Sequence, residues 1–174
     1  MSQNGFNVVI NFIGNKEATF NNALVYFNAD EEGDWVQLVD NSILGYEIIL
    51  LKIVDLNTNK NKYIFAKNTN ITVSNNTINI YTFSELTFFI ETKVKKQYSE
   101  QYKEINKKVV ALEAMQQLGI SIDQLLEFNK LKDEKYILKM KNIHKLKEEG
   151  QHWRLKKYFY LQKQLVRLLL PLLL

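Results

Sequence analysis

The sequence predicts an α+β protein, with an N-terminal antiparallel β-sandwich followed by a C-terminal helical hairpin and an extra third helix. Apolar residues alternate with polar ones in the first half, most clearly from Ile71 to Ile80, which is the two-residue period of a β-strand. From Ile90 onward, apolar residues recur every three or four positions. That spacing is typical of a helix with one apolar face.

Charge and composition change at the same position. Residues 1–90 carry 5 lysines and 9 acidic residues, whereas residues 91–174 carry 18 basic and 10 acidic residues. Asparagine is divided as sharply, because 16 of the 19 lie in the first segment. Two segments with different surface chemistry therefore meet here. We place the boundary between a sandwich domain of residues 1–89 and a helical arm of residues 90–174.

Composition narrows the class of protein. With 174 residues, of which 46% are hydrophobic, the chain can build a packed core. It contains no cysteine, which excludes disulfides and thiolate chemistry and fits a reducing, cytoplasmic setting. The first residues, Met1–Asn4, do not combine a basic region with an apolar run, so no signal peptide is expected.

Short strands separated by turn residues account for the first half. Asn75-Asn76 between two alternating runs predicts a two-residue hairpin turn, because asparagine tolerates positive φ. The run from Ile43 to Val54 is long for one straight strand, and we expect it to bend or bulge at Gly45. Strand spacing of this kind favours a compact antiparallel sandwich or barrel. The expected strands are Phe6–Ile13, Leu24–Ala29, Trp35–Val39, Ile43–Val54, Lys62–Lys67, Ile71–Ser74 and Thr77–Phe83.

The second half predicts helices joined by a short link. The first is expected over Glu91–Leu118, with Gly119 as a left-handed cap after its end. Ser121 followed three residues later by Gln124 predicts a capping box that starts the second helix. The link is short enough to make the two helices antiparallel neighbours. Residues 151–170 are expected to form the third helix.

One apolar stripe on the first predicted helix is a candidate protein-binding surface. Its spacing of three and four residues suits packing against another helix. Two interpretations follow: a helix of a partner protein binds the stripe, or the second helix of the same chain covers it entirely. The stripe consists of Val94, Tyr98, Tyr102, Ile105, Val109 and Leu112.

The apolar run Leu165–Leu174 is too short to cross a bilayer. A spanning helix needs about 20 apolar residues, and this run of ten is interrupted by Arg167 and Pro171. We expect it to dock on the domain or on a partner. The alternative is peripheral membrane contact through residues 153–174, which combine basic and aromatic side chains.

The sequence shows no motif for catalysis or for cofactor binding. It has no glycine-rich phosphate loop and no nucleophile elbow. His144 and His152 lie eight residues apart without carboxylates in helical register, so no metal site is expected. The acidic run Asp30–Asp34 lacks the spacing of a calcium loop. We therefore predict a non-enzymatic protein with no catalytic residue, no cofactor and no bound metal.

Five motifs lie in one order over residues 6–118, and together they resemble the epsilon subunit of F-type rotary ATP synthases. In that family a β-sandwich precedes a helical hairpin. The matching segments are Phe20 with Leu24 and Phe27, Glu32-Gly33-Asp34, Val39–Leu44, the hairpin Ile71–Ile80, and Ile90-Glu91.

The resemblance implies a non-catalytic central-stalk subunit. Such a subunit would dock on a gamma-type shaft, lie near alpha- and beta-like ATPase subunits, and reside in the cytoplasm, peripheral to the cell membrane. Asp40, Asn41 and Ser42 stand in the family's docking loop, but without its prolines and histidine. Thr92-Lys93-Val94 offers no arginine where the family's ATP-binding segment has one. These departures and the longer arm indicate a specialised ATPase-like motor complex.

Two other functions remain open from the sequence. The chain could be an unrelated β-sandwich adaptor or scaffold with a helical oligomerisation arm. It could also be a basic nucleic-acid-binding protein, since lysines cluster between Lys93 and Lys108. Acidic residues are interleaved with those lysines, as on a solvated helix face, and we therefore predict no nucleic-acid partner.

Overall fold

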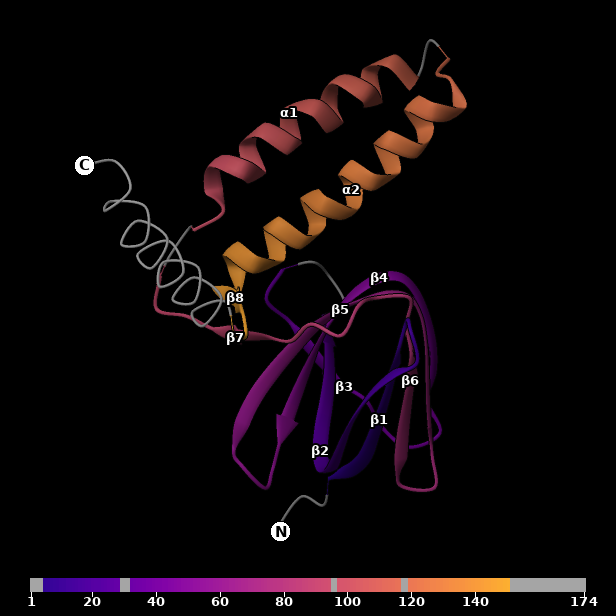
Figure 1. Ribbon diagram of the computed structural model, residues 1–174, viewed down its shortest axis with the longest axis vertical. Coiled ribbons are helices and arrows are strands. Elements are labelled where there is room, and N and C mark those ends of the chain that lie inside the picture. Colours follow the sequence, from indigo (N-terminus) through magenta and orange to yellow (C-terminus); the bar gives the residue numbers. More distant parts are fainter. Residues whose placement is uncertain (1–4, 29–31, 95–96, 117–118, 151–174) are drawn as a thin grey trace, which may run out of the picture.

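The computed structural model describes residues 5–28, 32–94, 97–116 and 119–150. It shows a β-sheet unit with a helical hairpin built on one side of it (Figure 1). The predicted α+β class and the hairpin are confirmed. The third helix expected over residues 151–170 lies outside the described residues.

Eight strands and two helices make up the described chain. The strands are β1 (Phe6–Phe12), β2 (Lys16–Asn28), β3 (Trp35–Gln37), β4 (Ile43–Asp55), β5 (Lys60–Ser74), β6 (Thr77–Tyr81), β7 (Phe89–Glu91) and β8 (Leu146–Glu148). The helices are α1 (Ser99–Gln116) and α2 (Ile122–Ile143). Strand β2 begins earlier than predicted. The side chain of Asn22, which lies in this earlier part of the strand, accepts a hydrogen bond from the backbone N–H of Gly5 (2.9 Å).

The predicted antiparallel sandwich is wrong in one respect, because the strands form one mixed sheet. Strands β1, β2, β4, β5 and β6 form a ring in which each strand pairs with the next. The four pairs β1–β2, β2–β4, β4–β5 and β5–β6 are antiparallel, so β6 runs in the same direction as β1. The pair that closes the ring, β1 with β6, is therefore parallel.

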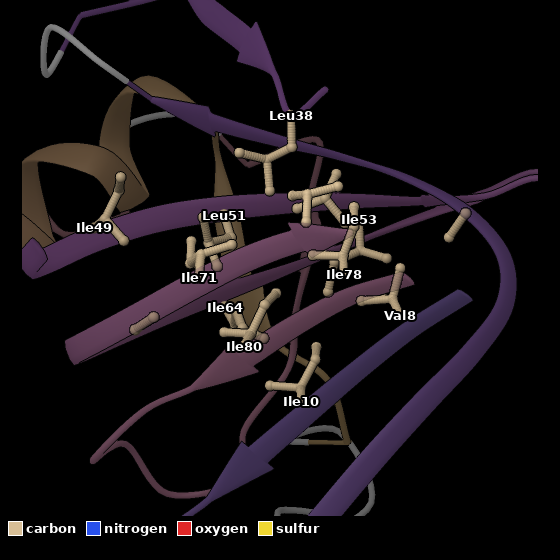
Figure 2. Packing of buried hydrophobic residues seen from close by; sticks show 14 of the residues in the cluster. Val8, Ile10, Leu38, Ile49, Leu51, Ile53, Ile64, Ile71, Ile78 and Ile80 are labelled. Atoms are coloured by element: carbon tan, nitrogen blue, oxygen red, sulfur yellow. The ribbon is translucent and has the colours of Figure 1, made fainter. Parts of the chain in front are cut away.

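The main core lies inside this closed sheet. Ile10 and Ile80, from the neighbouring strands β1 and β6, face Leu51 and Ile64 from β4 and β5 (Figure 2). All four are almost fully buried. Burying side chains of this size contributes about 1.5–3 kcal/mol each, which makes the sheet the stable platform of the molecule.

Asparagine shapes the turns of the sheet. Asn75 and Asn76 both have positive φ (50° and 58°), so the predicted two-residue hairpin turn is confirmed. We expected a bend or bulge at Gly45, but Gly45 pairs regularly with Asn70 and the strand pairing is not interrupted there. The β4–β5 pairing instead skips Glu47 and Asn68, and Asn68 has a φ of 42°. Asparagine tolerates this left-handed conformation, and no sequence pattern distinguishes it from its neighbours.

Helix α1 begins eight residues later than predicted. Phe89–Glu91 forms strand β7, which pairs with β8, so this segment cannot also be helical. The helix starts where Asn142 of α2 accepts a hydrogen bond from the backbone N–H of Tyr98 (3.1 Å). A cap donated from a distant part of the chain has no local sequence signal.

The predicted link between the helices is confirmed in detail. Gly119 has a φ of 93°, which suits a residue without a Cβ. Ser121 is the N-cap of α2, and its hydroxyl accepts from the backbone N–H of Gln124 (3.2 Å). The side chain of Gln124 accepts in return from the Ser121 backbone N–H (2.9 Å). This is the capping box expected from the sequence.

The hairpin is attached to the sheet at both of its ends. The strand that leads into it, β7, pairs with β5 and with β8, the strand that follows it. Leu50, Tyr136, Met140 and Leu146 belong to a second buried cluster between the sheet and α2. The backbone N–H of Leu50 donates to the Tyr136 hydroxyl (2.9 Å). The helices are therefore a fixed extension of the sheet rather than a loosely tethered arm.

Candidate functional site

The predicted stripe on α1 packs against α2. Ile105 and Val109 are buried in a third cluster, and Tyr98, Tyr102 and Leu112 are packed against it. The α2 side chains of this seam are Phe128, Leu131 and Leu138. The interpretation in which the second helix covers the stripe is therefore the arrangement that the structure shows.

Val94 does not belong to the stripe. It lies before α1 begins, in the segment that follows β7, and its side chain is exposed. Its assignment is wrong because the helix starts at Ser99, so the helical period does not extend back to it. Binding of a second protein to Val94 or to the other stripe residues stays a prediction.

The second predicted surface, Asp40–Ser42, is an exposed but firmly held loop. The backbone N–H of Asn41 donates to the carbonyl of Val73 (2.9 Å), and the Val73 N–H donates to the Ser42 carbonyl (2.8 Å). Asn41 has a φ of 62°, which asparagine accepts better than most residues. The next residue, Ile43, is 82% exposed. A rigid loop beside an uncovered apolar side chain can bind a partner with little loss of conformational entropy.

The two predicted surfaces lie at different parts of the sheet. The loop contacts Val73 at the end of β5, whereas α2 packs on Phe65 and Tyr63 in the first half of the same strand. The structure therefore does not bring the stripe and the loop together into one site. A partner that used both would have to reach around the sheet.

A polar cluster at the base of the hairpin was missed by the sequence reasoning. The Tyr63 hydroxyl donates to the carboxylate of Glu91, and burial together with this bond raises the pKa of the tyrosine. The ring of Trp35 lies against that of His144, with centroids 4.9 Å apart. These four residues come from β3, β5, β7 and the end of α2. No local spacing could have indicated that they meet.

His144 is a partly buried histidine whose protonation is disfavoured in the folded protein. Its Nε2 atom is buried without a hydrogen-bond partner among the described residues. Burial lowers the pKa of the imidazole from its ordinary value, the Glu91 carboxylate opposes this, and Lys52 adds to it. The neutral ring is therefore the form that the folded protein favours.

We expect His144 to make the protein less stable as pH falls. Because the folded-state pKa is depressed, the unfolded chain binds the proton first once pH drops below about 6.5. The unfolding free energy should then decline until pH reaches the folded-state value. Urea unfolding of wild type and His144→Gln between pH 7.5 and 5 measures this. A slope with pH that is equal in both proteins would contradict the expectation.

The described residues form clefts but no cluster of metal-binding side chains. They contain no group of three His, Asp or Glu side chains that could hold a metal ion. The cleft between β4 and α2 has a volume of about 230 Å³. The cleft between α1 and α2 has a volume of about 310 Å³ and is lined by Tyr102, Val109, Lys132 and Lys139 among others. No helix in the described part of the chain is long and apolar enough to span a membrane.

Two of the three lysines of α1 are paired with acids on the helix surface. Lys103 binds Glu100 (2.9 Å) and Lys108 binds Glu104 (3.0 Å), one turn apart on the exposed helix surface. Such pairs are typical of a solvated helix face. This surface does not favour the nucleic-acid alternative.

Fold and surfaces together define an α+β protein whose closed mixed sheet carries a fixed helical hairpin. The chain belongs to the UU051 family. Residues 7–87 match the model of the UU051 N-terminal domain, and residues 99–149 match that of the C-terminal domain of uncharacterised protein UU051. The chain is 40% identical over 141 residues to "Uncharacterized protein UU051" of Ureaplasma parvum serovar 3. That alignment covers 78% of this chain and 83% of the relative.

Proposed function

We propose that this chain is a non-catalytic stalk subunit of a rotary ATPase-like complex, similar in layout to the epsilon subunit. The observation that carries the proposal is the order and joining of its parts, a closed β unit followed directly by an antiparallel helical hairpin. The sequence motifs quoted above supply the link to that family. A gamma-like shaft and alpha- and beta-like subunits are the proposed partners.

The exposed loop is the proposed docking point on the shaft. Asp40 and Ser42 present polar groups beside the uncovered Ile43, and the backbone hydrogen bonds to Val73 keep the loop in one conformation. Interfaces of this kind combine a central apolar contact with a polar rim. The complex would place the protein in the cytoplasm, at the membrane periphery, with residues 153–174 as the proposed membrane-contacting segment.

The structure supports a coupling role in which the sheet and the helical hairpin move together as one rigid body. A swinging arm would have to unpair β7 from β8 and expose Met140 and Leu146, which are fully buried. Uncovering these two side chains costs on the order of 3–6 kcal/mol. Only a partner that binds the open state more strongly by at least this amount could drive that change. We propose that the compact form is the one that binds the shaft.

Co-purification tests the proposal. The tagged full-length chain, produced together with candidate alpha-, beta- and gamma-like subunits, is expected to elute in one complex with the gamma-like subunit. The double variant Asp40→Ala/Ile43→Ser should weaken that retention by about tenfold or more, as expected for loss of a central interface contact. Glu17→Ala/Thr19→Ala, which alters exposed residues of β2, is the matched control and should elute as wild type.

The wild-type and loop-variant results test two separate claims: that the chain is a stalk subunit, and that the loop is its docking point. If the wild-type chain does not elute with any shaft subunit, the stalk-subunit proposal is overturned. If the wild type elutes in the complex and the loop variant does so equally well, the loop is not the docking point and the subunit assignment stands.

A further inference from the structure

An open hollow lies on the outer face of the sheet, next to the loop Asp40–Ser42. It is formed by β4, β5 and the segment that follows β6, and its volume is about 490 Å³. Ile43 and Gly45 are exposed, whereas Leu44 between them packs against the main core. Because side chains alternate along a strand, Ile43 and Gly45 belong to the same outer face. The hollow over Gly45 therefore adjoins the apolar side chain of the proposed docking point.

The hollow owes its shape to a glycine and to an irregularity in the strand pairing. A Cβ added to Gly45 would lie 3.5 Å from Oδ1 of Asn70, so the missing side chain leaves a space that the carboxamide of Asn70 borders. The β4–β5 pairing skips Glu47 and Asn68, and both of these exposed residues line the hollow. A carboxylate and two carboxamides, all of which can accept hydrogen bonds, thus surround one open space.

The hollow is acidic. Among the described residues that line it, Glu47 alone is charged. Glu47 is not one of the acidic residues that form ion pairs in the described chain. The adjacent lysine, Lys67, is bound instead by Asp133 (2.8 Å). A positively charged group that entered the hollow would therefore find a carboxylate with which it can pair.

An exposed aromatic ring forms one wall of the hollow. Phe83 is 71% exposed, and Tyr81, which pairs with Asn70 across the sheet, is also exposed. A planar guanidinium can lie on such a ring while its N–H groups donate to carboxylate and amide oxygens. An ammonium group lacks this planar fork of donors. The ring, the carboxylate and the carboxamides together favour an arginine side chain as the occupant.

We propose that the protein that docks at the loop inserts an arginine side chain into this hollow. The guanidinium lies over Gly45, between Glu47 and the ring of Phe83, while a neighbouring apolar residue of the partner contacts Ile43. The inference rests on the proposed function in one respect, because it takes this partner to be the shaft subunit. It adds the chemistry by which that subunit is recognised.

A short peptide tests the hollow without the shaft subunit. The ¹⁵N-labelled full-length chain is titrated with acetyl-leucyl-arginine amide and followed by NMR. We expect saturable shifts with a dissociation constant in the millimolar range, largest at Gly45 and at the side-chain amides of Asn68 and Asn70. The same peptide with citrulline in place of arginine keeps the size and removes the charge, and it should bind at least about threefold more weakly.

Two variants and a control assign the binding to the named residues. Glu47→Gln and Phe83→Ser should each weaken binding of the arginine peptide by about threefold or more. Both positions are exposed, so both variants should keep their fold. Glu17→Gln, which removes an exposed carboxylate of β2, should bind as wild type does. Equal binding of the arginine and citrulline peptides, or equal binding by wild type and Glu47→Gln, overturns the proposal.

Co-purification with the gamma-like subunit then identifies the source of the arginine. Glu47→Gln/Phe83→Ser should weaken retention by about tenfold, and Glu17→Gln should not. If the double variant is retained as well as wild type, the shaft does not supply the arginine and the proposal is overturned, while the stalk assignment stands. If wild type itself is not retained, the stalk assignment and the shaft as partner both fall, and the peptide titration alone decides whether the hollow binds arginine.

Discussion

Replacing Met140 by alanine should lower the free energy of unfolding by about 2–5 kcal/mol. Met140 is completely buried between α2 and the sheet, in the cluster that includes Leu50, Tyr63 and Leu146. The shorter side chain leaves a cavity where the hairpin joins the β unit, and the surrounding atoms relax only partially. Urea unfolding followed by circular dichroism measures the loss.

Ile143 provides the matched control on the same helix. It lies three residues further along and is 41% exposed, so Ile143→Ala should change stability much less than Met140→Ala does. If the two variants lose similar amounts, Met140 is not part of a packed junction, and the hairpin is not fixed to the sheet as described.

The parts of this fold that could be predicted are those with a local physical cause. Alternating apolar residues indicated most strands, and the pairs Asn75-Asn76 and Ser121 with Gln124 indicated a turn and a helix start that the structure contains. In each case the residues that determine the conformation are within a few positions of one another.

The predictions that were wrong concern features that depend on residues far apart in the sequence. The run at Ile90 has an apolar pattern compatible with either a strand or a helix, and only its pairing with β8 decides between them. The parallel β1–β6 pair follows from closure of the whole sheet. At the candidate site, the sequence indicated that the α1 stripe would be buried but could not identify the helix that covers it. The group around His144 depends on four separate elements and left no local signal.

Replacing Val109 by lysine should separate the two helices of the hairpin. Val109 is 1% exposed and lies in the seam with Phe128 and Leu131. A lysine there would put a charged group into the apolar seam, with Glu113 lining the same hollow, and this costs about 1–3 kcal/mol. Helix α1 should then lose protection from amide hydrogen exchange, while strands of the closed sheet such as β1 and β6 keep theirs.

Val110→Lys is the control, because the neighbouring residue on the same turn is 52% exposed and its replacement should change the unfolding free energy by less than about 0.5 kcal/mol. The pair of variants also distinguishes the two interpretations of the α1 stripe. If α2 covers the stripe, Val109→Lys unfolds the hairpin of the isolated chain. If a partner helix covers it instead, the isolated Val109→Lys protein should be as stable as Val110→Lys and lose only its association with that partner. In that case the closed seam between α1 and α2 would not be the arrangement in solution, because a buried lysine could not be accommodated there without cost.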